Sequence, residues 1–173
     1  MSPSGYLKRT RKGQLVILKN VITGAQTGVD RAALHAATRA GLHVDGYCTK
    51  GGPGEESLIP GNHPIQELGT TQYQIRIENN VVISDGTLII NKGPLTQGTK
   101  LSYDFSVKHL MPCLIVQLDA EQTMPASTVT RWINEHQITT LNIAGPKESK
   151  FPEGIYREAY SYLEKLFTML KNA

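Results

Sequence analysis

The sequence predicts an α/β protein with a Rossmann-like, three-layer fold, in which helices cover both faces of a mainly parallel sheet. Two observations support this class. The apolar runs along the chain are continuous rather than alternating, as expected for strands that are buried on both faces. Segments with helical spacing separate these runs, which is the pattern of repeated strand–helix–strand units. A chain of 173 residues is long enough to close one full core.

The first predicted strand covers residues 15–23 and leads directly into a helix over residues 30–40. Thr27 and Asp30 have the spacing of a capping box at the start of this helix, and Gly41 ends it. Small residues at helical spacing allow this helix to pack closely on the sheet. They are Val29, Ala33, Ala36, Ala37 and Ala40.

The same signals predict the remaining elements. A short strand at residues 43–47 precedes a Gly- and Pro-rich loop at residues 49–64, which is too long for a plain connector and is therefore a functional candidate. Further helices are expected from Thr70 or Thr71 to about Ile83 and at residues 99–110, 127–136 and 152–170. Further strands are expected at residues 87–91, 113–118 and 140–144. The total is about five strands and five helices.

Positive charge is concentrated at the N-terminus. The net charge is +3, but the first 20 residues hold five basic residues and no acidic one. The rest of the chain therefore has 13 basic against 15 acidic residues. We expect residues 1–14 to form a flexible basic arm and residues 15–173 to form a single domain. A basic body surface for nucleic acid is not expected.

Other signals narrow the class of protein. No apolar segment approaches the length of a membrane span, and the N-terminus lacks the apolar core of a signal peptide, so a cytoplasmic protein without membrane contact is expected. Cys48 and Cys113 fit no metal or redox spacing and are expected to be free thiols. The five histidines include no pair at zinc-helix spacing, so no protein-ligated metal is expected.

Three Gly-containing loops follow predicted strands and are the candidate ligand site. The first runs from Gly24 to Gly28 and ends at a helix N-terminus, where glycines let the backbone approach an anion and the first N–H groups lack internal partners. It is neither a Walker A motif nor a GxGxxG fingerprint, which disfavours a nucleotide triphosphatase or a nicotinamide enzyme. The alternative is a tight turn in which Thr27 and Asp30 only cap the helix.

The second and third loops cover residues 93–99 and 144–149. Gly98 and Thr99 put unpaired N–H groups and a hydroxyl at a helix start. Lys147 adds a point charge and Ser149 a hydroxyl donor, while Glu148 suits a sugar or an amine. Parallel strands end at the same edge of a sheet, so the three loops are expected to converge on one phosphate or oxyanion site.

Contact of Asp30 and Arg31 with a ligand is one hypothesis, but the two residues are adjacent on the predicted helix and point apart, so we expect a cap and a surface pair there. Lys50 lies at the start of the long loop, where its side chain can reach an anion. The alternative, which is more common for a loop lysine, is a side chain that contacts only solvent.

The run at residues 24–34, Gly-Ala-Gln-Thr-Gly-Val-Asp-Arg-Ala-Ala-Leu, closely resembles the opening of a family known as the putative molybdenum carriers. Further matches follow in order, at residues 47–51, at Tyr73, Arg76 and residues 80–81, and at residues 84–89, 93–99 and 141–149. The resemblance extends from about residue 15 to the C-terminus.

This resemblance implies a Rossmann-like fold related to molybdenum cofactor carrier proteins and to lysine-decarboxylase-like nucleotide-binding proteins, which are commonly dimers or tetramers. It implies a carrier or sensor that holds molybdenum cofactor, molybdate or a phosphorylated nucleotide-like ligand. With the loop residues, the candidate ligand-binding set is Gly24, Gln26, Thr27, Gly28, Lys50, Asn80, Gly93, Pro94, Gly98, Thr99, Gly145, Lys147, Glu148 and Ser149.

One departure from the related phosphoribohydrolases favours binding over catalysis. Those relatives carry Pro-Gly-Gly-x-Gly-Thr-x-x-Glu, whereas here Leu95 replaces a glycine and Ser102 replaces the catalytic glutamate. The alternative is a hydrolase that cleaves an N-glycosidic or phosphate bond of a nucleotide derivative, with Glu148 as the candidate carboxylate. A third hypothesis is a regulatory module that acts through oligomer contacts.

Overall fold

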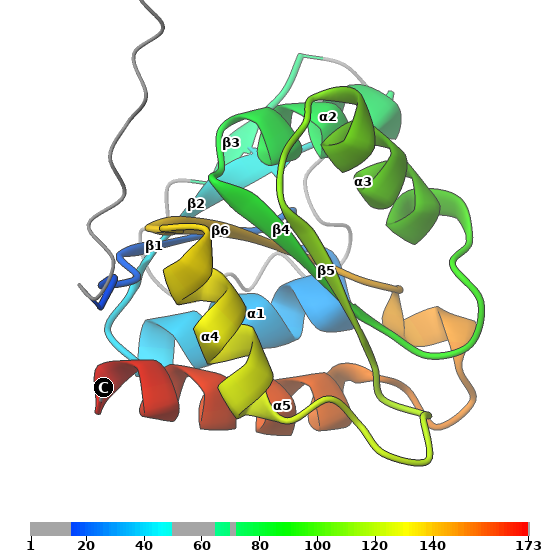
Figure 1. Ribbon diagram of the computed structural model, residues 1–173. Helices are drawn as coiled ribbons and strands as arrows, with labels where there is room; N and C mark the ends of the chain where they lie inside the picture. The colour runs from blue at the N-terminus through cyan, green and yellow to red at the C-terminus, as the bar shows by residue number, and fades with distance from the viewer. Residues whose placement is uncertain (1–14, 50–64, 70–71, 173) are drawn as a thin grey trace, which may run out of the picture.

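A six-stranded sheet lies between two layers of helices in the computed structural model, which describes residues 15–49, 65–69 and 72–172 (Figure 1). Every pair of neighbouring strands is parallel, in the order β3-β2-β1-β6-β4-β5. The strands are β1 (Asn20–Ile22), β2 (His43–Cys48), β3 (Ile65–Glu67), β4 (Gly86–Asn91), β5 (Cys113–Gln117) and β6 (Thr140–Ala144). The predicted three-layer α/β class is thus confirmed.

The order of the strands reverses at the centre of the sheet. β1, β2 and β3 follow one another from the centre of the sheet to one edge, and β4 and β5 form the other side. The last strand, β6, lies between β1 and β4. Val21 of β1 is paired with Leu141 of β6, and Leu88 of β4 is paired with Ile143 of β6. In open parallel sheets such a reversal leaves a crevice at the carboxyl ends of the strands.

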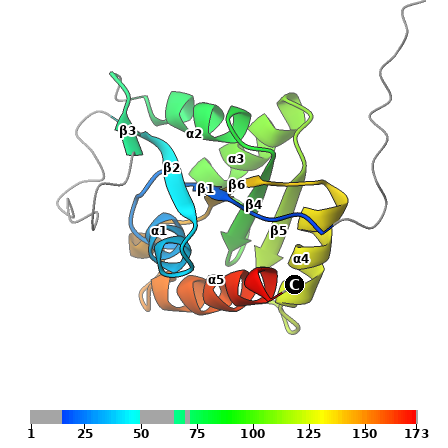
Figure 2. The same cartoon turned by 90° about the vertical axis from the view of Figure 1, so that its left-hand side faces the viewer.

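The helices form two unequal layers. On one face lie α1 (Val29–Arg39), α4 (Ala126–Glu135) and α5 (Tyr156–Lys171), with α5 in contact with both others. On the opposite face lie α2 (Tyr73–Val82) and α3 (Gln97–Lys108), which contact each other. Figure 2 shows this division of the helices about the sheet. A short 3₁₀ helix, η1 (Glu148–Lys150), follows β6.

The core confirms the predicted packing face of α1. Ala33, Ala36 and Ala37 are buried, and α1 contacts β2 and β6 of the sheet as well as α5. Small side chains allow α1 to approach the elements that it packs against closely. Every residue of β4 is buried, which explains why its sequence is continuously apolar from Leu88 to Ile90.

Some predicted boundaries are wrong for identifiable reasons. β1 has only three residues, because its pairing with β2 and β6 begins at Asn20, and Leu15 and Ile17 lie exposed before it, at 56% and 74% of their full accessible area. β3 was not predicted, since three residues are too short to show a pattern. α5 begins at Tyr156 rather than at residue 152, because Gly154 adopts a positive φ of 73° just before it.

The helix caps also differ from the expectation. The capping box predicted between Thr27 and Asp30 does not form, because the N-cap of α1 is Gly28, with φ 82° and no side-chain cap. A capping box forms instead at α3, which begins two residues earlier than predicted. There the Thr96 N–H donates to Thr99 Oγ1 at 3.1 Å, and the Thr99 hydroxyl donates to the Thr96 carbonyl at 2.7 Å.

Two predicted features lie outside the described residues, namely the basic arm at residues 1–14 and the loop residues 50–64, which include Lys50. Within the described part of the chain, no helix combines the length and apolar character needed to cross a membrane.

Candidate functional site

A cavity of about 380 Å³ lies at the carboxyl ends of β1 and β6, beneath α2 and the start of α3. Residues from all three predicted loops line it. They are Gly24 and Gln26 after β1, Gly98 and Thr99 at the start of α3, and Gly145 and Lys147 after β6. The predicted convergence of the three loops on one edge of the sheet is therefore observed.

The loops after β1 and β6 pack against each other. The Val29 N–H donates to the Pro146 carbonyl at 3.2 Å, which ties the start of α1 to the loop after β6. Gly28 has φ 82°, and a Cβ placed there would overlap the backbone of Pro146 and Glu148. Gly28 is thus required for the contact between the loops, and it does not itself line the cavity.

A buried ion pair forms part of the cavity wall. Arg76 of α2 and Asp30 of α1 are 7% and 5% exposed, and 3.4 Å separates Arg76 Nη1 from Asp30 Oδ2. Burial raises the pKa of the Asp30 carboxyl, and Arg76, a hydrogen bond from the Gln26 backbone and Lys147 oppose that rise in pKa. The buried Arg76 Nε has no hydrogen-bond partner in the structure.

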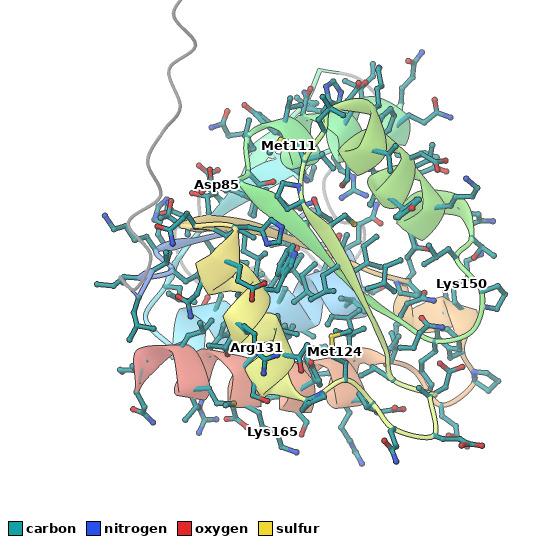
Figure 3. All side chains as sticks on the ribbon, in the orientation of Figure 1. Asp85, Met111, Met124, Arg131, Lys150 and Lys165 are labelled. Carbon is teal, nitrogen blue, oxygen red and sulfur yellow. The ribbon has the colours of Figure 1, made fainter. Side chains whose placement is uncertain are left out.

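Positive charge predominates around this cavity. Among the described lining residues, Arg76, Lys147 and Lys150 are cationic, and Asp30 is the one carboxylate. Both lysines are exposed, whereas Arg76 is buried in the wall. Figure 3 labels Lys150 in η1, near the loop that leads into α3. An anion that enters the cavity therefore meets a net positive field.

The neutral polar groups of the cavity are held by the protein itself. The Ser102 hydroxyl donates to the Gly98 carbonyl at 3.0 Å, and Asn142 Nδ2 donates to Thr87 Oγ1 at 3.2 Å. Asn80 accepts from the Tyr47 N–H at 2.8 Å and donates to the Tyr47 carbonyl at 3.2 Å. Asn80 therefore binds the backbone of β2 through two hydrogen bonds and also lines the cavity.

Half of the predicted binding residues line the cavity. These are Gly24, Gln26, Asn80, Gly98, Thr99, Gly145 and Lys147. Lys50 lies outside the described residues. Six others lie elsewhere in the structure, namely Thr27, Gly28, Gly93, Pro94, Glu148 and Ser149.

Gly93 and Glu148 each have a structural partner away from the cavity. The Gly93 N–H donates to Asp119 Oδ2 at 2.8 Å, which closes a turn at the ends of β4 and β5. Glu148 Oε2 accepts the N–H groups of Ile155 and Tyr156 at 2.9 and 2.8 Å. A carboxylate that pairs with the first N–H groups of a helix stabilises that helix, and Glu148 does this for α5.

The Asp30–Arg76 pair was not predicted from the sequence. The surface location predicted for Asp30 and Arg31 is wrong, since both residues are buried. Arg31 Nη2 donates to the Ala25 carbonyl at 3.2 Å and so supports the loop after β1. The available signal was Arg76 itself, because its spacing of four residues from Asn80 places both residues on one face of the helix.

Comparison with known proteins places these features in a family. Residues 21–167 match the circularly permutated YpsA SLOG family. The structure is similar to the crystal structure of a putative molybdenum carrier protein from Syntrophus aciditrophicus SB, with a TM-score of 0.77 and 36% identity. That similarity covers 88% of this chain and 97% of the other. A search of curated proteins found no match. The two matches confirm the resemblance carried by residues 24–34.

The described residues contain no group of three or more His, Cys, Asp or Glu side chains placed to hold a metal ion. Cys48 and Cys113 are free thiols.

Proposed function

The chain belongs to the circularly permutated YpsA SLOG family, and we propose that it binds a small anionic ligand in the cavity at the carboxyl ends of β1 and β6. The observation that carries this proposal is the charge of the cavity, where three cationic side chains surround one carboxylate among the described lining residues. Side chains of this kind attract and hold phosphate or another oxyanion.

The three cations have different places in this proposal. Lys147 and Lys150 are exposed at the cavity, where they provide mobile point charges that attract an incoming anion. Arg76 is buried and ion-paired, so its guanidinium is held in place before a ligand arrives. Arg76 lines the cavity, and a guanidinium carries charged donors that suit an oxyanion.

The size and lining of the cavity favour a ligand larger than a bare oxyanion. A volume of about 380 Å³ lies within the range of small-molecule sites. Tyr73 and Ile77 of α2 add an aromatic and an aliphatic surface on which a flat ring can pack. We therefore propose a phosphorylated, nucleotide-like or pterin-type ligand. The structural neighbour is described as a putative molybdenum carrier protein, which makes molybdenum cofactor and molybdate specific candidates.

The family resemblance also leads us to propose that the protein works as a homo-oligomer. Exposed apolar side chains on α2, on α3 and directly after α3 support this proposal, among them Ile75, Val107 and Leu110. Association would remove such side chains from water.

Native mass spectrometry of the purified protein tests for a co-purifying ligand, and calorimetric titration with AMP, GMP and molybdate tests the named classes. We expect Lys147→Ala and Lys150→Ala each to weaken binding about tenfold or more, since a hydrogen bond to a charged group contributes about 1.5–3 kcal/mol. Lys165→Ala on α5 is the matched control, because Lys165 is exposed and does not line the cavity. Equal affinity in all three variants would refute the site.

A further inference from the structure

Asp30 is the one carboxylate among the described residues that line the cavity, and its charge is balanced from within the cavity wall. Its Oδ2 lies 3.4 Å from Arg76 Nη1, and the Gln26 backbone donates a hydrogen bond to the carboxylate. The positive charge of Lys147 also acts on Asp30. Arg76 and Lys147, which favour the ionised form of Asp30, are thus the same cations that the proposed function assigns to an incoming anion.

We propose that the cavity binds an anion and a proton together, and that Asp30 is the group that takes up the proton. This inference rests on the proposed function and adds to it a dependence of ligand affinity on pH. The reason is competition for the same positive charge. An anion close to Arg76 and Lys147 offsets the charge that favours the ionised carboxylate, and it brings a second negative charge near that buried carboxylate. Both effects favour the protonated form of Asp30.

The geometry of the buried pair suits this exchange. The separation of 3.4 Å is longer than the distance of about 2.7–2.9 Å that is typical of charge-assisted hydrogen bonds, so Arg76 does not make its strongest possible contact with Asp30. Both side chains are more than nine-tenths buried, so salt screens their interaction with a bound anion only weakly. Burial already raises the pKa of Asp30. A protonated Asp30 needs no counter-charge, which leaves the charge of Arg76 available to the anion.

The other groups around Asp30 do not supply this proton exchange. The other titratable residues that line the described part of the cavity are Tyr73, Arg76, Lys147 and Lys150. Side chains of these three types carry their protons at neutral pH, and no histidine is among the described lining residues. Cys48 of β2 also feels the charge of Arg76, but burial raises the pKa of its thiol, which therefore stays neutral. Asp30 is the group that remains.

Calorimetric titration of the full chain with sulfate tests the coupling, because sulfate keeps its charge at neutral pH and exchanges no proton itself. Phenyl sulfate is a second probe of the same kind that adds a ring. Titrations in buffers with different enthalpies of ionisation give the number of protons taken up per bound anion. We expect uptake between the pKa of Asp30 in the free protein and its higher pKa in the complex. The affinity should fall by up to about tenfold per pH unit across that window.

Asp30→Asn is the decisive variant, because its neutral amide resembles the protonated acid. It should bind sulfate without proton uptake, and with an affinity that does not change with pH. Above the window of proton uptake, this affinity should exceed that of the wild type, since the substitution removes a negative charge from an anion site. Asp104→Asn makes the same chemical change on the exposed face of α3 and should take up protons as the wild type does. Cys48→Ala should do the same.

A direct measurement on the wild type does not depend on the folding of any variant. Carbon-13 NMR of the protein with labelled aspartate carboxyl groups follows the ionisation of Asp30 with and without sulfate. The pKa of the buried carboxyl should rise when the anion binds, whereas the pKa of the exposed Asp104 should not change. Because this titration observes Asp30 itself, it applies equally to AMP if the two sulfates do not bind.

The outcomes separate the two proposals. Binding of an anion with no proton uptake at any pH between about 5 and 9, or with no change in the pKa of Asp30, overturns this inference and leaves the proposed function intact. Proton uptake that persists in a folded Asp30→Asn protein, or that disappears in Cys48→Ala, also overturns it. Absence of binding to both sulfates, to AMP and GMP and to molybdate refutes the proposed function and this inference with it.

Discussion

The backbone of Gly24 packs directly against the guanidinium group of Arg76, leaving no room for a side chain at residue 24. A Cβ built on Gly24 would overlap Arg76 Nη1 and would lie 2.8 Å from Asp30 Oδ2. From the sequence, Gly24 is predicted to let a ligand approach the backbone closely. The structure adds a second requirement, since this glycine makes space for the buried ion pair of the cavity wall.

Gly24→Ala should therefore destabilise the protein by about 1–3 kcal/mol, the usual cost of an added methyl group in a packed site. Gly69→Ala is a suitable control, because a Cβ there meets no atom within 4 Å. Denaturant unfolding of both variants measures the difference in the free energy of unfolding. Equal stability of the two variants would show that Arg76 can move aside without cost and that the Asp30–Arg76 ion pair does not require a glycine at residue 24.

Substitutions at Gly28 and Gly98 should have different effects. Gly28→Val should impair folding, because Gly28 has φ 82° and its Cβ would overlap the loop after β6. Gly98 lacks a positive φ, and its Cβ would make ordinary contacts with Ile77 and Tyr73. Gly98→Ala should thus melt near the wild-type temperature and change only ligand affinity. Thermal melting with calorimetric titration tests this, and a folded Gly28→Val protein would contradict it.

The stability of the protein should depend on pH through Asp30. The folded-state pKa of Asp30 is raised by burial, so the folded state binds its proton more tightly than the unfolded state does. The contribution of Asp30 to the free energy of unfolding is therefore greatest below the unfolded pKa and declines as the pH rises through the folded pKa. The free energy of unfolding of the wild type and of Asp30→Asn can be measured by denaturant unfolding across this pH range. The stability of the wild type relative to Asp30→Asn should fall as the pH rises. A pH-independent difference would contradict the direction of the shift.

Glu148→Gln should weaken the start of α5. The carboxylate accepts the N–H groups of Ile155 and Tyr156, and an uncharged amide interacts less favourably with the helix N-terminus. We expect a loss of about 1 kcal/mol, the typical value for a helix cap. Glu121→Gln, in an exposed turn, serves as the control in thermal melting. A loss of ligand affinity with unchanged stability would instead place Glu148 in the binding site.

Oligomer formation should depend on the exposed apolar side chains of α2 and α3 and not on residues 1–14. Leu110, which follows α3, is 91% exposed, and Val107 is also exposed. Placing a charge at either residue by Val107→Lys or Leu110→Lys should shift the full chain toward monomers in light scattering. Removal of residues 1–13 should leave the assembly unchanged. A monomeric wild type refutes the first expectation, and loss of assembly on truncation refutes the second.

Local patterns in the sequence were sufficient for most of the fold. Strand signals in the sequence predicted five of the six strands, and small residues predicted the packed face of α1. The position of the loops at one edge followed from the parallel sheet, because all parallel strands end on the same side. Lys147, Gly98 and Gly145, which line the cavity, were therefore predictable at this edge from the sequence alone.

The chemistry of the cavity wall depended on tertiary contacts. Asp30 and Arg76 lie 46 residues apart, and their pairing requires α1 and α2 to meet at the carboxyl ends of β1 and β6 from opposite faces of the sheet. Glu148 has the sequence context of a site residue, yet the approach of α5 gives its carboxylate two backbone donors. The sequence by itself thus determined the sheet, its helices and the edge that carries the loops, because these follow from local spacing and strand direction. Only the tertiary structure decided which charged side chains face the cavity, because the docking of distant helices decides which charges are buried together.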